Sequence, residues 1–198
     1  MENKKTLFIL AATLVLLISG AFMLYHRLEP GVEHRQLSAQ KIPAQKETQE
    51  ADDGEEKIPA PDFTVYDAEG SEVHLKDYIG KPVVLNFWAS WCGPCQSEMP
   101  DFHEKYLELG EEIHFLMINM TDGSRETVES ASDFISEHEY TFPVFYDTKS
   151  DAAIAYGAYS LPTTFFIDTA GYAVAQATGA IDEAALQKGI DMILTDKK

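Results

Sequence analysis

The chain has 198 residues, and its 33 Asp and Glu residues against 15 Lys and Arg residues leave a net charge of −18. This length favours one folded domain with appended segments. Because nucleic acids and anionic lipid surfaces bind basic patches, the acidic balance argues against both as partners. The charge is typical of a soluble domain, with steering of a basic partner as the alternative.

The first 25 residues predict a membrane anchor. Residues 6–25 carry no charge and are long enough to cross a bilayer as a helix. Lys4 and Lys5 precede them, which predicts that residues 1–5 stay in the cytoplasm and that the rest of the chain is extracytoplasmic. A cleavable signal peptide is the alternative, with the small residues 19–21 as its cleavage site, although the apolar run continues past them.

The composition changes twice after the predicted anchor. Residues 26–57 are rich in Gln, Glu, Lys and Ala, lack aromatic residues and show no sustained period, which predicts a flexible linker. The alternation of polar and apolar residues that marks folded structure begins near Ile58. We therefore expect a single domain over residues 58–198.

This domain reads as strands alternating with helices. An alternating pattern over residues 63–75, around a turn at 67–70, predicts an N-terminal β-hairpin. The apolar run 82–88 predicts a central strand that is buried on both faces. Further predicted elements are a helix at 96–109 with an apolar stripe that includes Leu107, a strand at 113–119, a helix at 124–139 capped by Ser124, a strand at 143–146, a helix at 151–156, a hairpin at 163–177 and a helix that Asp182 caps. The pattern indicates an α/β fold, with a central mixed β-sheet flanked by helices.

The two cysteines, Cys92 and Cys95, follow the predicted central strand where a helix begins. Backbone N–H groups and the helix dipole stabilise a thiolate at that position, and the second thiol can attack a mixed disulfide that the first one forms. A structural zinc site normally needs four protein ligands, and the six scattered histidines supply no second half-site, so we expect no metal. Two buried core cysteines without chemistry are the alternative.

The run VVLNFWASWCGPCQSEMP at residues 83–100, with SLPTTFFID at 160–168, resembles the thioredoxin fold. More narrowly, the chain is similar to the membrane-tethered bacterial thiol-disulfide oxidoreductases of the TlpA/ResA-like branch. The resemblance implies a thioredoxin-like fold with a central helix-strand insert at residues 121–147. It also implies a redox-active Cys92–Cys95 disulfide without a further cofactor, a disulfide-containing protein substrate such as apocytochrome c, and a membrane electron donor of the CcdA or DsbD type.

The resemblance also assigns roles to residues. Cys92 is the expected nucleophile and Cys95 the resolving cysteine. Asn86 stands where thioredoxin has a buried acid, so Glu98 becomes the expected proton acceptor for Cys95, with a solvated helix glutamate as the alternative. The residues expected to contact substrate are Trp91, Gly93, Pro94, Leu161 and Pro162, the last of them after a cis peptide bond. Gly93 and Pro94 between the cysteines are typical of reducing thioredoxins.

Three other functions remain as alternatives. A thiol peroxidase of the same fold requires Thr three residues before the reactive cysteine, where this chain has Ala89. A non-catalytic thioredoxin-like binding module would not need the intact cysteine pair. Reduction of other exported proteins or spore-envelope proteins is the alternative to a role in cytochrome c maturation.

Overall fold

The computed structural model describes Ser19 and residues 58–194. The predicted cytoplasmic residues 1–5, the anchor at 6–25 apart from Ser19, and the linker at 26–57 lie outside the described residues. In the part that is described, no helix has the length and apolar character needed to cross a membrane.

Strands and helices alternate along residues 58–194, as the sequence pattern predicts. The strands are β1 (Ile58–Pro59), β2 (Thr64–Tyr66), β3 (Glu72–His74), β4 (Val83–Trp88), β5 (His114–Asn119), β6 (Val144–Tyr146), β7 (Thr163–Ile167) and β8 (Tyr172–Thr178). The helices are the 3₁₀ turn η1 (Leu75–Tyr78) and the α-helices α2 (Gly93–Leu109), α3 (Val128–Glu137), α4 (Asp151–Tyr156) and α5 (Glu183–Leu194). The strands form one mixed sheet in the order β1-β8-β7-β4-β5-β6-β2-β3.

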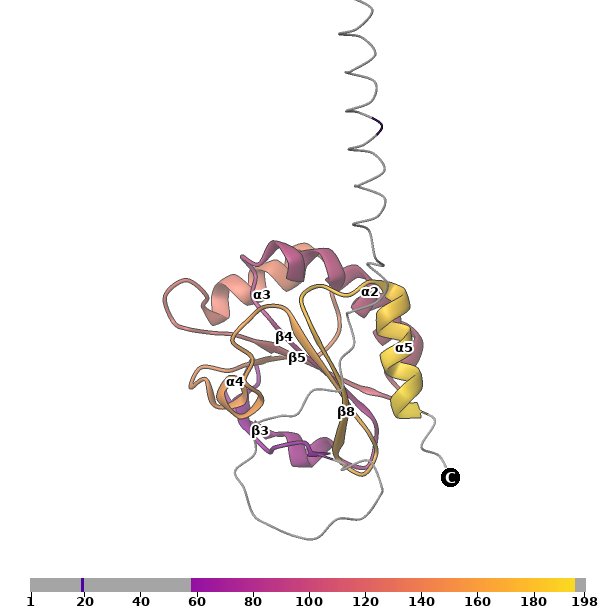
Figure 1. Ribbon diagram of the computed structural model, residues 1–198. Helices are drawn as coiled ribbons and strands as arrows, with labels where there is room; N and C mark the ends of the chain where they lie inside the picture. The colour runs from indigo at the N-terminus through magenta and orange to yellow at the C-terminus, as the bar shows by residue number, and fades with distance from the viewer. Residues whose placement is uncertain (1–18, 20–57, 195–198) are drawn as a thin grey trace, which may run out of the picture. The chain divides into compact units, whose positions relative to one another are not determined.

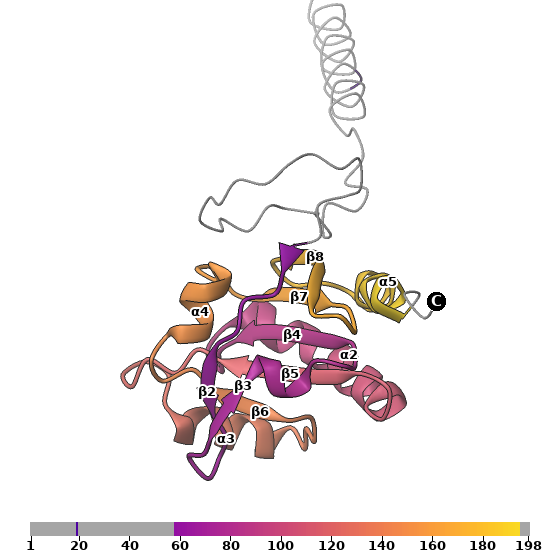
Figure 2. The ribbon, with the colours of Figure 1, turned by 90° about the horizontal axis from the view of Figure 1, so that it is seen from below.

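Strand β4 lies at the centre of this sheet, parallel to β5 and antiparallel to β7 (Figure 2). All six of its residues are buried, as expected for a strand covered on both faces. Val84 and Trp88 belong to a core that includes side chains of α2, α3 and α5, whereas Leu85 and Phe87 belong to a second core that includes η1 and α4. The helices therefore cover both faces of the sheet, and α2 and α3 lie on the same side (Figure 1).

The N-terminal hairpin and the central insert are both present. Strands β2 and β3 pair antiparallel around the predicted turn, and α3 and β6 make up the helix-strand insert. Strand β1 is an addition to the predicted elements, because its two residues pair with β8 through contacts that no local pattern encodes.

Helix α3 begins at Val128, and its cap is Thr127, not Ser124 as predicted. The Thr127 hydroxyl accepts a hydrogen bond from the backbone N–H of Ser130 at 3.1 Å. Ser124 instead belongs to a turn in which the Asp122 carboxylate accepts backbone hydrogen bonds. The predicted helix at 124–139 was therefore too long at its start, because the residue types that begin a helix also form polar turns.

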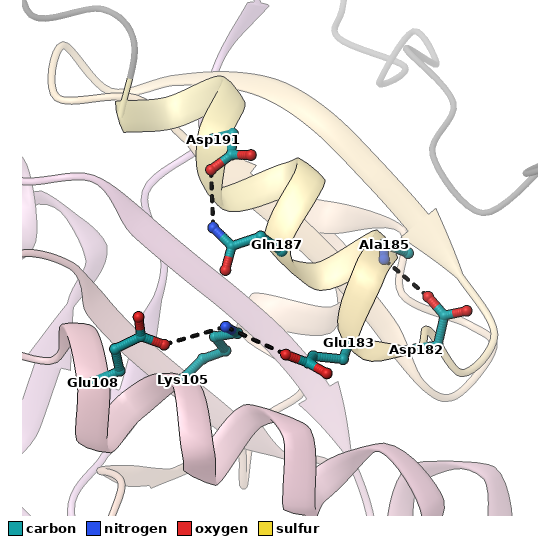
Figure 3. A network of polar contacts seen from close by, with 7 residues as sticks. All are labelled: Lys105, Glu108, Asp182, Glu183, Ala185, Gln187 and Asp191. Atoms are coloured by element: carbon teal, nitrogen blue, oxygen red, sulfur yellow. Dashed lines mark hydrogen bonds and ion pairs between the residues drawn. The ribbon is translucent and has the colours of Figure 1, made fainter.

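Helix α2 contacts α5 over the first core. Figure 3 shows that Lys105 on α2 lies between Glu108 of the same helix and Glu183 of α5, at 3.2 Å and 3.6 Å. The predicted cap of α5 is confirmed, since Asp182 Oδ1 accepts from the Ala185 N–H at 2.8 Å. The predicted apolar stripe of α2 was wrong at Leu107, which is exposed because it faces away from the sheet.

Candidate active site

The two cysteines lie where β4 gives way to α2. Cys92 is the N-cap of the helix, and its sulfur accepts a hydrogen bond from the Cys95 N–H at 3.3 Å. Pro94 occupies the first turn, where its missing N–H has no cost. The two sulfurs form a disulfide, with the Cα atoms 5.2 Å apart. The oxidised pair therefore lies at the positive end of a helix dipole, a position that favours a thiolate on Cys92 after reduction.

The cysteines differ in their access to solvent. Cys95 is fully buried and Cys92 is 5% exposed, while Gly93 and Pro94 between them are exposed. Only Cys92 therefore offers surface to a second protein, whereas Cys95 reaches the sulfur of Cys92 from inside the fold. This is the arrangement that an attacking and a resolving cysteine require.

The segment before β7 lies at the same end of the sheet as the cysteines. Thr163 pairs with Phe87 across the β7–β4 ladder, which places Pro162 beside the end of β4. The Leu161–Pro162 peptide bond is cis, as predicted, and the Pro162 carbonyl accepts from the Gly179 N–H at 2.9 Å. Leu161 packs against the core cluster that contains both cysteines. The predicted substrate-contacting residues of the two segments are thus brought to one end of the sheet.

Glu98 lies on α2, three residues after Cys95, and is only 2% exposed. The Asn86 side chain of β4 donates a hydrogen bond to Glu98 Oε1 at 2.8 Å. The backbone N–H of Ile181 donates to Oε2 at 2.9 Å. Glu98 is therefore a buried carboxyl held between β4 and the segment that leads into α5, and not a solvated helix residue.

Burial raises the pKa of Glu98 from 4.5 to about 7, since the charged carboxylate loses its hydration. The hydrogen bonds from Ile181 and Asn86 oppose this rise because they stabilise the charged form. A carboxyl that titrates near neutral pH can both accept and release a proton under ordinary conditions. The site therefore holds a carboxyl that can exchange a proton near neutral pH, on the same helix as the buried Cys95.

Asn86 connects Glu98 to β7. Its Nδ2 also donates to Thr164 Oγ1 at 3.0 Å, across the pair of residues that face each other in the β4–β7 ladder. Its Oδ1 is buried without a hydrogen-bond partner among residues 58–194. Asn86 cannot exchange a proton itself, but it orients the carboxyl that can.

The loop before Cys92 is held by residues for which the sequence analysis assigned no role. The Glu126 carboxylate accepts from the Ser90 N–H at 2.8 Å and from the Ser90 hydroxyl at 2.7 Å. It also accepts from Asn119 Nδ2 at 2.6 Å. Glu126 is fully buried, and these three donors supply the hydrogen bonds that its carboxylate needs there.

Next to Glu126, Arg125 lies over the ring of Trp91, with its guanidinium carbon 3.5 Å from the ring centroid. Arg125 is the single arginine in residues 58–194, which is the one signal in the sequence that could have drawn attention to it. Glu126 offers no such signal, because it stands in a polar stretch that resembles any solvated loop.

Within the described ranges, no group of three or more His, Cys, Asp and Glu side chains is arranged to hold a metal ion. The chemistry that the site offers rests on the two sulfurs and on Glu98.

Known proteins are similar to this chain in sequence and in fold. The profile of the AhpC/TSA family matches residues 57–175. The thiol-disulfide oxidoreductase ResA of Bacillus thuringiensis subsp. konkukian (strain 97-27) is 37% identical over 137 residues, which cover 68% of this chain and 76% of that protein. The crystal structure of a DsbF homologue from Corynebacterium diphtheriae is 31% identical with a TM-score of 0.63, over 77% of this chain and 97% of that one.

StoA from Bacillus subtilis is 25% identical with a TM-score of 0.57, over 66% of this chain and 97% of StoA. The fold is therefore thioredoxin-like, and the cysteine pair stands in a scaffold shared with thiol-disulfide oxidoreductases. On these grounds the chain belongs to the AhpC/TSA family of thioredoxin-fold proteins, as a thiol-disulfide oxidoreductase of the ResA and StoA type with the Cys92–Cys95 pair as its redox couple.

Proposed function

We propose that this protein is a membrane-tethered, extracytoplasmic reductant of protein disulfides, acting on apocytochrome c before haem attachment. The observation that carries the proposal is the buried Glu98, whose pKa of about 7 and position after Cys95 suit it to deprotonate the resolving thiol. The uncharged residues 6–25 after Lys4 and Lys5 support the tether and the extracytoplasmic side.

The reaction has two exchange steps. The Cys92 thiolate attacks one sulfur of the substrate disulfide, forms a mixed disulfide and releases the other substrate sulfur as a thiolate, which takes a proton. Glu98 accepts the proton of Cys95, whose thiolate then attacks the Cys92 sulfur and releases the second substrate thiol. The substrate gains two electrons and two protons, and the protein is left with the Cys92–Cys95 disulfide.

The direction follows from the residues between the cysteines. Gly93 and Pro94 resemble those of reducing thioredoxins, whose potential is about −270 mV, against about −120 mV for the oxidant DsbA. The oxidised protein must then be returned to the dithiol by an electron donor. We assign this step to a membrane protein of the CcdA or DsbD type, since the predicted anchor would hold both in one membrane.

Trp91, Gly93, Pro94, Leu161 and Pro162 form the proposed contact surface for the substrate chain. Peroxide reduction is not part of the proposal, because Ala89 occupies the position where thiol peroxidases carry Thr. Other exported proteins and spore-envelope proteins are the alternative substrates.

Two measurements test the proposal. The redox potential of the full chain, measured by equilibration with glutathione or dithiothreitol, should lie near −270 mV, and a value near −120 mV would refute a reducing role. Trapping in cells with the Cys95→Ala variant, which stalls the mixed disulfide at Cys92, should capture apocytochrome c. The Cys92→Ala/Cys95→Ala variant is its matched control and should capture nothing; capture of other exported proteins instead would identify them as the substrates.

A further inference from the structure

Arg125 places a positive charge over the ring of Trp91, an exposed residue next to the cysteine pair. Its guanidinium carbon lies 3.5 Å from the centroid of Trp91, a ring that is 42% exposed and directly precedes Cys92. A cation–π contact of this kind is attractive even at an exposed site, and it favours one position for a long side chain. The arginine is thereby held against Trp91, the residue that directly precedes Cys92 in the chain.

Hydrogen bonds on both sides of Arg125 fix the loop that carries it. Asp122 Oδ1 accepts hydrogen bonds from the backbone N–H groups of Ser124, Arg125 and Glu126, at 2.7, 2.8 and 3.0 Å. These bonds lower the pKa of Asp122 to about 2, so the carboxylate stays charged and keeps the turn closed at any ordinary pH. The two bonds between Glu126 and Ser90 fasten the other side of the loop to the residue before Trp91.

The N–H donors of the guanidinium group nevertheless have no acceptor among residues 58–194. Throughout residues 58–194, its only recorded contact is the ring of Trp91, with no hydrogen bond or ion pair to a protein acceptor. Arginine presents five N–H donors in a planar fork that matches a carboxylate, and stacking on an aromatic face leaves such donors for another acceptor. Because the side chain is already ordered, a ligand that uses those donors loses little further side-chain entropy.

We propose that Arg125, held against Trp91, is a specificity-determining residue that binds an Asp or Glu carboxylate of the substrate protein beside its disulfide. The inference rests on the proposed function, because it names the chemistry of the substrate segment that this active site meets. It opposes the protein's net charge of −18, which repels acidic partners at a distance. At contact the local cation decides, since charges further away than about 8 Å are largely screened at physiological ionic strength.

The test uses two synthetic peptides with one intramolecular disulfide each, identical except that one cysteine is flanked on both sides by Asp in the first and by Asn in the second. The pre-reduced full chain is mixed with each peptide at physiological ionic strength, and the rate constant for peptide reduction is measured in acid-quenched samples. Arg125→Gln should lower the ratio of the Asp rate to the Asn rate about fivefold, which is near the upper limit for an exposed charge pair. Arg125→Lys should retain part of the ratio, because it keeps the charge but not the fork.

Lys188→Gln is the matched control, since it removes one positive charge from an exposed position on α5 and should leave the ratio as in the wild type. The preference of the wild type should also weaken as salt is added above physiological ionic strength, because the contact between the guanidinium and the carboxylate is then screened as well. An unchanged ratio in Arg125→Gln overturns the proposal, including the case in which both peptides slow equally because the arginine acts on the Cys92 thiolate. A fall of the same size in Lys188→Gln also overturns it, because the effect would then be one of net charge. The redox potential and the trapped partners test the proposed function separately, so either proposal can fail alone.

Discussion

Asn86 of β4 donates a hydrogen bond to the carboxyl of Glu98 on α2 at 2.8 Å, across the interface between the central strand and the helix that carries both cysteines. The Asn86 amide thereby orients a carboxyl whose pKa is about 7. In the reaction proposed above, Glu98 exchanges the proton and Asn86 holds its carboxyl in position.

The first prediction is that Glu98 makes the oxidised protein less stable as the pH rises. Its pKa is about 7 in the folded protein and 4.5 as the ordinary value, so the folded state holds the proton more tightly. The contribution is complete below about pH 4.5 and is lost as the pH rises through about 7, with an upper limit of about 3 kcal/mol. Denaturant unfolding at pH 5 and pH 8 should show this loss in the wild type but not in Glu98→Gln. A pH dependence that the substitution leaves unchanged would contradict it. Glu104→Gln, on the exposed side of the same helix, is the matched control.

The second prediction concerns the resolving step. If Glu98 accepts the proton of Cys95, the rate at which a preformed mixed disulfide at Cys92 is resolved should rise with pH around an inflection near 7. Glu98→Gln should lose this inflection and slow the step by about 10²-fold, the lower end of the range for general base catalysis. Stopped-flow measurement of thiol release checks both, and a retained inflection would exclude Glu98 as the base.

The third prediction concerns Gly189 on α5. A Cβ atom at this position would lie 2.2–2.5 Å from three ring atoms of Phe166 on β7, so the helix needs glycine to approach the sheet. Alanine is the better helix former by about 1 kcal/mol, but overpacking costs about 1–3 kcal/mol. Gly189→Ala should therefore lower the free energy of unfolding in spite of the gain in helix propensity. Ala184→Gly, at an exposed position of the same helix, measures the propensity effect alone. A stabilised Gly189→Ala protein would show that the ring yields at little cost.

The fourth prediction is that Glu126 keeps the loop before Cys92 in place. Glu126→Ala would leave the partly buried Ser90 N–H and hydroxyl and the fully buried Asn119 amide without their acceptor, and a buried unpaired donor costs about 1–3 kcal/mol. We expect a loss of about 3 kcal/mol in unfolding free energy and faster amide hydrogen exchange at residues 88–91. Glu129→Ala, an exposed substitution on α3, is the control. Unchanged exchange at residues 88–91 would show that the loop is held by other contacts.

The fifth prediction separates the charge of Lys105 from its packing. Lys105 is 7% exposed, while the side chains of its partners Glu108 and Glu183 are 58% and 61% exposed (Figure 3). Lys105→Met should change the unfolding free energy by less than about 1 kcal/mol, because an apolar chain of similar length fills the space and the two glutamates return to water. The Glu108→Gln/Glu183→Gln variant should lower the unfolding free energy by about 1–2 kcal/mol, because it leaves the Lys105 ammonium without an anionic partner. The reverse order in thermal or denaturant unfolding would contradict this account.

Much of the fold and the redox pair could be predicted from the sequence, because the signals are local. An apolar run, a glycine after a helix or a proline in a first turn acts within a few residues of itself, and the Cys92–Cys95 spacing places both sulfurs on one helical turn. The same local signals failed where one residue type serves two structures, as at Ser124, and where pairing is with a distant strand, as in β1.

Only the tertiary structure decided which carboxylates are buried at the active site and which lie in solvent. The sequence offered Glu98 either as a proton acceptor or as a solvated helix residue, and the choice depends on Asn86 and Ile181, which reach it from other elements. Glu126 meets the active-site loop from 36 positions along the chain, as its hydrogen bond with Ser90 shows, and Arg125 beside it meets Trp91. A carboxyl's pKa and a cation's partner are set by burial and by what surrounds the group in space, and sequence spacing does not encode either.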